Sequence, residues 1–388
     1  MNAGTAKCER ARRDIIRVIH RGLDPDNFAR AVTGVLGKVI PHDGTCLLTI
    51  DPSTMLPTGE VVENGLPAAA MPRLTEIELR ERDFNKFTAL ARGRQPAASL
   101  SQATGGDLQR SLRQRELRRP NGFADELRVV CRDEMGVCGA LTLLRAAGRP
   151  DFTLAEVRFA ASLAGSLADG LRRTMLLTGA ADNDHHLDDD GDIGVILLAP
   201  DDTVEMANRA AEHWLDELGA ADWPGVALPI VIRSVAGEAR TAAGNDGGDA
   251  RVARARVRTR VGRWVVARGS VLGDGPQCRV AIVLEAVRPP ELAPLIADAY
   301  GFTERERAIT ELVAQGFSTN GIAGRLHLSA YTVQDHLKSI FDKSGAGSRG
   351  DLVARLFFDH YAPRLSAQTP DHPAVHADAA RAGACDWL

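Results

Sequence analysis

The chain has 388 residues, which is too many for one ordinary hydrophobic core, so its length predicts two or three domains. Hydrophobic residues make up 44% and charged residues 25% of the chain, as is usual for globular proteins that fold in water. The formal net charge of −4 argues against a protein that coats nucleic acid nonspecifically.

Cysteine spacing, hydropathy and known motifs restrict the compartment and the chemistry. The six cysteines include no C-x-x-C pair, so neither a metal site nor a disulfide framework is indicated. No apolar run approaches the ~18 residues of a membrane span, and the charged N-terminal segment has no signal-peptide core. The phosphate-loop, H-E-x-x-H and G-x-S-x-G motifs of common enzymes are missing. We therefore expect a cytoplasmic protein that is not an enzyme, contacts no membrane and holds no metal.

Residues 1–178 are predicted to form an α+β domain, because helical apolar periodicity is followed by strand-like and then again by helical segments. The expected elements are a helix around 15–19, a helix over 28–39, a strand at 46–50, helices near 73–82 and 107–119, a β-hairpin, and a long helix over 153–174. Thr153 and Glu156 have the spacing of a capping box at the start of this last helix.

The hairpin is the clearest element of this domain. Asp133 and Gly136 occupy the first and fourth positions of a type I turn, after which a bulge is expected. In this register one face of the hairpin contains Leu127, Val129, Cys131, Gly139, Leu141 and Leu143, and the other contains Arg128, Arg132, Cys138 and Thr142. Cys131 and Cys138 then lie on opposite faces, which argues against a redox disulfide between them.

This succession of helix, antiparallel sheet and closing helix resembles a GAF-type sensory domain in layout, without a diagnostic motif. Segment 179–192 is acidic and is predicted to be a linker. Within it, His185 and His186 stand beside the acidic run 188–190, a pattern that also suits metal ligands, although such runs are usually solvated.

Residues 193–287 are predicted to form a second, smaller domain. The expected elements are strands at 193–198, 251–260, 263–272 and 278–285 and a helix over 207–218. This arrangement resembles a PAS-type domain. Neither resemblance identifies cofactor-binding residues; we expect no cofactor, and an unidentified small-molecule ligand in either sheet domain is the open alternative.

A row of arginines marks one strand of the second domain. Arg254, Arg256, Arg258 and Arg260 share one face by period-two alternation. The row suits binding of an anion or of nucleic acid, and the alternative is an exposed sheet face that carries like charges.

The C-terminal part begins with a linker or connecting helix at 288–301 and ends with a tail at 364–388 that is predicted to be disordered. Between them, 302–363 is predicted to contain four short helices. Their N-caps are Thr303, Ser318, Ser329 and Ser348, and Gly316 and Gly345 lie where helices end. Only about three residues separate the two middle helices, 318–326 and 329–343, which is the spacing of a helix-turn-helix.

The helix at 329–343 has two distinct faces at about 100° per residue. Val333, Leu337, Ile340 and Phe341 form an apolar stripe, and Tyr331, Gln334, Asp335, Lys338 and Asp342 fall on a separate polar face. A helix with a packed back and a hydrogen-bonding front suits the major groove of DNA. An ordinary amphipathic helix with a solvated face has the same pattern.

The residues of this segment decide between these interpretations, because they closely resemble the LuxR/GerE-type DNA-binding domain. The matching residues are Phe302–Glu306, Gly316, Ser318, Ile322–Ala323, Leu328–Ser329, Thr332–Val333, His336, Ile340, Lys343, Gly345 and Ser348–Arg349. The expected fold class is multidomain α+β, with GAF-like and PAS-like antiparallel-sheet domains followed by an all-α four-helix DNA-binding domain that contains a helix-turn-helix.

The resemblance implies a sequence-specific transcriptional regulator whose partners are double-stranded DNA, a second copy of the chain and RNA polymerase. The residues expected at DNA are Tyr331, Thr332, Gln334, Asp335, Lys338, Lys343 and Arg349, and those expected in a dimer are Leu352, Val353, Leu356 and Phe357.

Charge keeps a second interpretation open. Seven Lys and Arg residues balance seven Asp and Glu residues between 303 and 363, whereas a DNA-binding domain usually has a basic surface. The alternative is a sensor or scaffold that binds a protein or a metabolite and in which the C-terminal domain mainly dimerises.

Overall fold

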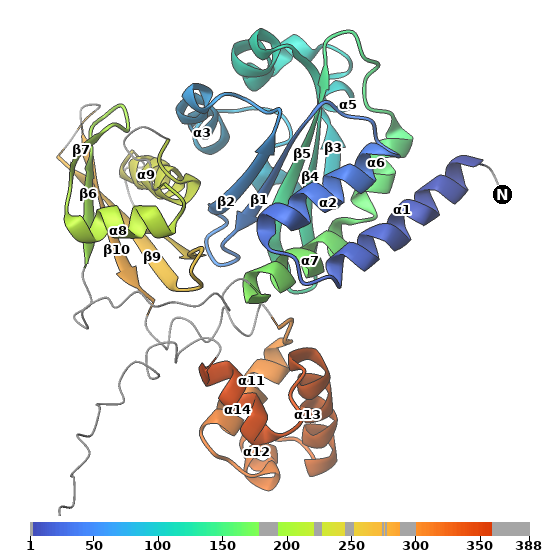
Figure 1. The fold of residues 1–388 in the computed structure, drawn as a ribbon, viewed down its shortest axis with the longest axis vertical. Coiled ribbons are helices and arrows are strands. Elements are labelled where there is room, and N and C mark those ends of the chain that lie inside the picture. The colour runs from blue at the N-terminus through green and yellow to red at the C-terminus, as the bar shows by residue number, and fades with distance from the viewer. Residues whose placement is uncertain are drawn as a thin grey trace, which may run out of the picture.

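The fold consists of two five-stranded antiparallel sheets with their helices, followed by a helical C-terminal unit (Figure 1), which confirms the expected fold class. This computed structural model describes residues 3–177, 193–220, 227–244, 252–273, 275, 278–287 and 300–358. The predicted linker at 179–192 with its histidine pair, the connecting helix expected before residue 300 and the tail at 364–388 lie outside these residues. Among the helices that are described, none is both long and apolar enough to cross a membrane.

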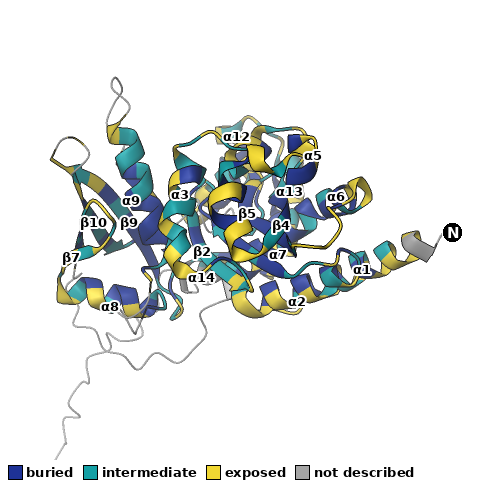
Figure 2. Ribbon diagram, turned by 90° about the horizontal axis from the view of Figure 1, so that it is seen from above, coloured by how far each residue is buried: buried dark blue, intermediate teal, exposed yellow. Residues whose placement is uncertain are grey.

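The first sheet unit has the strand order β2-β1-β5-β4-β3. Its elements are α1 (Ala3–Ile19), α2 (Pro25–Gly37), β1 (Gly44–Ile50), β2 (Pro57–Glu63), α3 (Met71–Leu79), α4 (Phe87–Arg92), β3 (Ala97–Ser99), α5 (Leu100–Thr104), β4 (Phe123–Asp133), β5 (Gly136–Ala146), α6 (Leu154–Ala161) and α7 (Ala164–Leu177). Helices α1, α2 and α7 cover one face of this sheet, where the largest hydrophobic core of the chain lies (Figures 1 and 2).

Two of the predicted helices differ from the structure. The segment 107–119 contains a 3-10 turn (Leu108–Arg110) and, after Ser111, a short helical stretch that is a π-helix over Gln114–Arg118 and continues into a second 3-10 turn (Arg119–Asn121). The long closing helix is divided into α6 and α7 at Ser162, whose hydroxyl donates to the carbonyl of Phe159 (2.6 Å) and accepts from Arg12 (2.8 Å). These side-chain hydrogen bonds compete with the helical pattern and interrupt it. The predicted capping box of Thr153 and Glu156 is confirmed.

The hairpin has the predicted pairing, except at one cysteine. Cys131 pairs with Gly139 and Asp133 with Gly136, with a bulge between these pairs, so the apolar face is as expected. Cys138 is the extra residue of the bulge, and its side chain lies in the same core as Cys131, with Sγ 3.4 Å from the carbonyl of Ala168. The expectation that the two cysteines lie on opposite faces was wrong, because a bulge disturbs the strict alternation of side chains. Cys131 and Cys138 are not joined by a disulfide bond.

The other face of the first sheet carries a buried network of charges. The side chain of Arg113 is fully buried and forms ion pairs with Asp83 (3.1 Å) and Glu126 (2.7 Å). Burial opposes ionisation of Glu126, but Arg113, Arg128 and Arg118 outweigh it and hold the pKa of this carboxyl far below its ordinary value. The segments that cover this face are therefore attached to β4 through paired charges.

The second sheet unit has the strand order β7-β6-β10-β9-β8. Its elements are β6 (Gly194–Leu198), β7 (Val204–Ala207), α8 (Arg209–Glu217), α9 (Ile230–Ala243), β8 (Ala253–Arg258), β9 (Trp264–Leu272) and β10 (Arg279–Ala286). Four strands and α8 correspond to predicted elements, whereas α9 was not delimited from the sequence. Helix α9 covers one face of this sheet and also contacts β2 and α3 of the first unit.

Two arginines of the predicted row, Arg256 and Arg258, join the two sheet units, whereas Arg254 and Arg260 are exposed. Arg256 donates to both carboxylate oxygens of Asp51 (3.1 and 3.0 Å) and to the hydroxyl of Ser53 (2.6 Å). Arg258 donates to the carbonyl of Met175 at the end of α7. The row is therefore not uniformly solvated, because two of its four side chains are used in contacts with the first unit.

Asp51 is the buried end of this contact, with a side chain that is fully enclosed. Burial opposes its ionisation, but the hydrogen bonds and the charge of Arg256 prevail and lower its pKa. A lowered pKa in the folded state stabilises the fold above the ordinary carboxyl pKa of ~3.9, and this contribution disappears as the pH falls through the folded value.

We expect Asp51→Asn to lower the free energy of unfolding of the sheet units by about 3 kcal/mol at neutral pH, because Arg256 loses its buried counter-charge. The difference from the wild type should shrink below about pH 4. Urea-induced unfolding across a pH series measures both effects. Asp14→Asn, which removes an exposed ion pair with Arg17, is the matched control and should cost less than about 1 kcal/mol. Equal stability of the Asp51→Asn variant and the wild type would contradict this role.

Candidate nucleic-acid interface

The C-terminal unit contains four helices in the predicted places. They are α11 (Glu304–Ala314), α12 (Thr319–Leu326), α13 (Ala330–Ser344) and α14 (Arg349–Phe358). Each begins at an expected hydroxyl, since Thr303, Ser318, Ser329 and Ser348 accept hydrogen bonds from backbone N–H groups three residues further on. Local sequence therefore determines where these helices start.

The turn between α12 and α13 has the geometry of a helix-turn-helix. His327 adopts a left-handed conformation (φ 55°, ψ 45°), and the N–H of Leu328 donates to the carbonyl of Ala323 (2.9 Å). Such a left-handed residue ends α12 and lets the chain start α13 at Ser329 without further residues. Helix α13 is thereby held at an angle to α12, as an element that enters a DNA groove requires.

The two faces of α13 are those predicted from periodicity. Val333 and Ile340 are fully buried and Leu337 is 6% exposed in the core of the unit. On the opposite side Gln334, Asp335 and Lys338 are exposed, and Tyr331 is 73% exposed near the N-terminus of the helix. The front of α13 is thus a row of hydrogen-bonding side chains on a rigid support.

Glu306 of α11 positions α13. Its carboxylate accepts hydrogen bonds from the N–H of Thr303 (2.7 Å), the hydroxyl of Ser339 (2.6 Å) and the ammonium group of Lys343 (2.6 Å). Burial opposes its ionisation, but these donors prevail and lower the pKa of Glu306. The capping-box spacing predicted the bond to Thr303, but no local pattern shows that two donors come from α13.

Three residues expected at phosphates make contacts within the unit. Lys343 is bound to Glu306, and Arg349 donates to the carbonyl of Phe317 and to the hydroxyl of Thr319, both at 2.8 Å. The hydroxyl of Thr332 lies 2.8 Å from that of Ser329. Lys343 and Arg349 thus also support the fold of the unit, and their contacts with DNA stay a prediction.

The residues expected in a dimer differ in their surroundings. Leu352 is fully buried in the core of the C-terminal unit, because the side of α14 that carries it faces the other helices. Val353 and Leu356 are half-buried at the edge of this core. The side chain of Phe357 lies outside the described part of the chain. Within that part, only Val353 and Leu356 of the predicted set reach the surface of α14.

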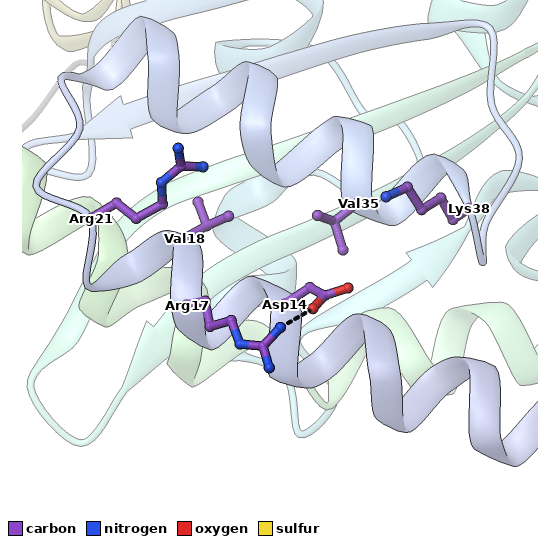
Figure 3. Close-up of a pocket in the computed structure, with 6 residues that line it drawn as sticks. All are labelled: Asp14, Arg17, Val18, Arg21, Val35 and Lys38. Carbon is purple, nitrogen blue, oxygen red and sulfur yellow. Dashed lines mark hydrogen bonds and ion pairs between the residues drawn. The ribbon is translucent and has the colours of Figure 1, made fainter.

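A groove in the described part of the chain lies between α1 and α2 (Figure 3). It encloses about 350 Å³ and is lined by Asp14, Arg17, Val18, Arg21, Val35 and Lys38. Asp14 accepts a hydrogen bond from Arg17 (3.0 Å). In the described residues no cluster of His, Cys, Asp and Glu side chains is arranged to hold a metal ion.

Comparisons with known proteins agree on the C-terminal unit. Residues 301–356 match the family model described as "Bacterial regulatory proteins, luxR family". A putative HTH-type transcriptional regulator of Aeromonas salmonicida is 41% identical over 70 residues, which are 18% of this chain and 35% of that protein. The transcriptional regulatory protein DesR of Bacillus subtilis (strain 168) is 28% identical over 95 residues, which are 23% of this chain and 48% of DesR.

The chain therefore spans between a third and a half of the length of these curated relatives, and residues 301–356 form a LuxR-type helix-turn-helix domain. Among solved structures, a GAF domain/HD domain protein from Geobacter sulfurreducens is 20% identical, with a TM-score of 0.27. The similarity covers 42% of this chain and 95% of that one, but this TM-score does not establish a shared fold.

We expect Glu306→Ala to destabilise the C-terminal unit by about 2 kcal/mol, because it removes a helix cap and leaves Ser339 and Lys343 without their acceptor. Hydrogen exchange of the amides in α11 and α13 of the full chain measures this loss. Glu304→Ala removes an exposed carboxylate from the same helical turn and should change the stability by less than about 0.5 kcal/mol. Equal protection in the two variants would show that Glu306 does not hold α13.

Proposed function

We propose that the protein is a sequence-specific DNA-binding transcriptional regulator that acts as a dimer under the control of its two sheet units. The observation that carries this proposal is the exposed front of α13, which stands on a buried back within a LuxR-type domain. We assign residues 1–178 and 193–287 to two sensory domains, 302–363 to the DNA-binding domain, and the segments between them to linkers. The proposed place of action is the cytoplasm, and the proposed role is not enzymatic.

Helix α13 enters the major groove with its N-terminus first in this proposal. Gln334 pairs with the Hoogsteen edge of an adenine, and Lys338 donates to a guanine. Asp335 accepts from N4 of a cytosine and repels phosphate, so it acts mainly against wrong sequences. Tyr331, which is the most exposed of these side chains, makes contacts at the entrance of the groove.

Thr332, Lys343 and Arg349 bind the phosphate backbone, which positions α13 without specifying the sequence. Lys343 remains paired with Glu306 when it meets a phosphate, so its net contribution is smaller than that of a free lysine. The equal numbers of positive and negative side chains between 303 and 363 point in the same direction. A single C-terminal unit should therefore bind DNA weakly.

Dimerisation through α14 compensates for this weakness, because two linked units bind two half-sites about one helical turn apart. Of the residues proposed for this contact, Val353 and Leu356 are those whose described side chains reach the surface of α14. A ligand or a partner protein that binds to the sheet units shifts the population of dimers that can bind DNA. Once bound, the dimer acts on RNA polymerase.

We expect Lys338→Ala to weaken specific binding by about 1–3 kcal/mol and to relax the preference at one base position. The full chain is used to select duplexes from a random pool, and the affinities of the variant for selected and random duplexes are compared. Loss of a phosphate contact, by contrast, weakens binding to both kinds of duplex equally. If Lys338→Ala also weakens both equally, Lys338 is a phosphate contact.

The competing function is that of a sensor or scaffold whose C-terminal unit only dimerises, and the internal engagement of Lys343 and Arg349 favours it. Salt distinguishes the two functions. For a DNA-binding protein, log K should fall linearly with log salt at a slope of about −0.9 for each phosphate that is neutralised. Fluorescence anisotropy of a labelled duplex between low and physiological salt measures this slope. A slope near zero, or no binding, would support the scaffold.

A further inference from the structure

Strand β9 has two apolar faces, and only one of them belongs to the core of its own unit. Val265 and Ala267 point toward α9 and lie in that core. Trp264 and Val266 alternate with them and therefore point to the outer face of the sheet. Although no helix in the described part of the second unit covers the outer face at this place, Trp264 is only 9% and Val266 only 1% exposed. Another part of the chain must cover them.

The cover is supplied by the C-terminal unit. Tyr300 and Leu356 pack against a cluster formed by Trp264, Val266 and Val287, which we call the outer cluster. Tyr300 also stacks on Phe302, with the ring centroids 5.6 Å apart, and Phe302 is fully buried in the core of the C-terminal unit. The contact therefore extends from the outer face of the second sheet into the core of the helix-turn-helix domain.

Helix α14 is occupied by this contact, whereas α13 is not. Figures 1 and 2 show α14 on the side of the C-terminal unit that is nearer to β9, and α13 on the far side. Leu356, a side chain that the proposed dimer requires, lies against the outer cluster. The front of α13 stays uncovered, with Tyr331 73% exposed.

We propose that the outer cluster is a docking surface for α14 of the same chain, and that docking competes with dimerisation of the C-terminal unit. The competition follows from geometry, because Leu356 cannot contact the sheet and a second copy of α14 at the same time. Docking leaves the groove-binding face of α13 open, so it controls the assembly of the dimer and not the access of a single unit to DNA. The inference rests on the proposed function of the C-terminal unit.

A buried polar group in the outer cluster favours the release of α14 from it. The indole N–H of Trp264 is buried and finds no acceptor among the described residues. A buried donor without a partner weakens the state in which it occurs, because the same group is hydrated when the cluster opens. Among the described residues this contact is also small, since it involves five side chains. A modest change elsewhere in the molecule is therefore sufficient to displace α14.

The first sheet unit reaches the docking surface through one residue. Arg258 is the cross-strand partner of Trp264 and donates to the carbonyl of Met175 in the last turn of α7. A movement of α7 that pulls on Arg258 thus acts on the strand pair that carries the outer cluster. This path links a signal in the first unit to the release of α14.

The test is Trp264→Ala in the full chain, with Leu272→Ala as the matched control. Leu272 lies on the same outer face of β9 but is 48% exposed and outside the cluster. We expect Trp264→Ala to lower the dissociation constant of the dimer about fivefold or more in analytical ultracentrifugation. Binding to duplexes selected by the wild-type chain should tighten with it, and Leu272→Ala should behave as the wild type.

Val287→Ala removes a second member of the outer cluster that is not part of the core of the second sheet, and it decides the test if Trp264→Ala fails to fold. Folded variants that self-associate as the wild type does would overturn the docking proposal, whatever happens with DNA. If the variants dimerise more tightly but no duplex is ever selected, docking stands and the proposed DNA-binding function fails.

Discussion

The architecture depends on the need of the second sheet to bury both of its faces. On one face α9 covers the core strands and at the same time contacts β2 and α3 of the first unit. On the other face Trp264 and Val266 are covered by Tyr300 and Leu356 of the C-terminal unit. Since side chains alternate along a strand, β9 alone carries both contacts. Strand β9 thus contacts the C-terminal unit on one face and, on the other face, the helix α9 that packs on the first unit.

Paired charges orient the elements that apolar contacts bring together. Arg256 with Asp51 fixes the position of the second sheet on the first, Arg113 with Glu126 attaches the covering segments to β4, and Glu306 with Lys343 joins α11 to α13. Such buried pairs add little net stability, because desolvation offsets most of the attraction. Their effect is on geometry, since a charge that leaves its partner inside the protein is costly. Because these pairs hold their elements in place, a rearrangement of the molecule takes place more easily at the weaker, uncharged contact of Trp264.

The two functional surfaces of the C-terminal unit, the front of α13 and the surface of α14, consequently differ in what covers them. The front of α13 is exposed on a buried back, so that the proposed base contacts require no rearrangement of the unit. The surface of α14 is shared between the chain itself and, in our proposal, a second copy. In our proposal, this domain of balanced charge binds DNA weakly alone and tightly only as a pair, which makes dimerisation the effective step for control. This explains why a regulator can leave its recognition helix uncovered.

The sequence by itself determined the local structure of this protein: the caps at Thr303, Ser318 and Ser329, the two faces of α13, and the cross-strand pairs of the β4–β5 hairpin. These features depend on residues a few positions apart. The same holds for the hydrogen bond that the Glu306 carboxylate accepts from the N–H of Thr303. Only the tertiary structure decided where Arg256 and Leu356 bind, that Ser162 interrupts the closing helix, and that Lys343 meets Glu306. The partner of Arg256 is 205 positions away in the chain, and no periodicity encodes such a distance. A pattern shows which face of an element is apolar or charged, but packing decides which other element it meets.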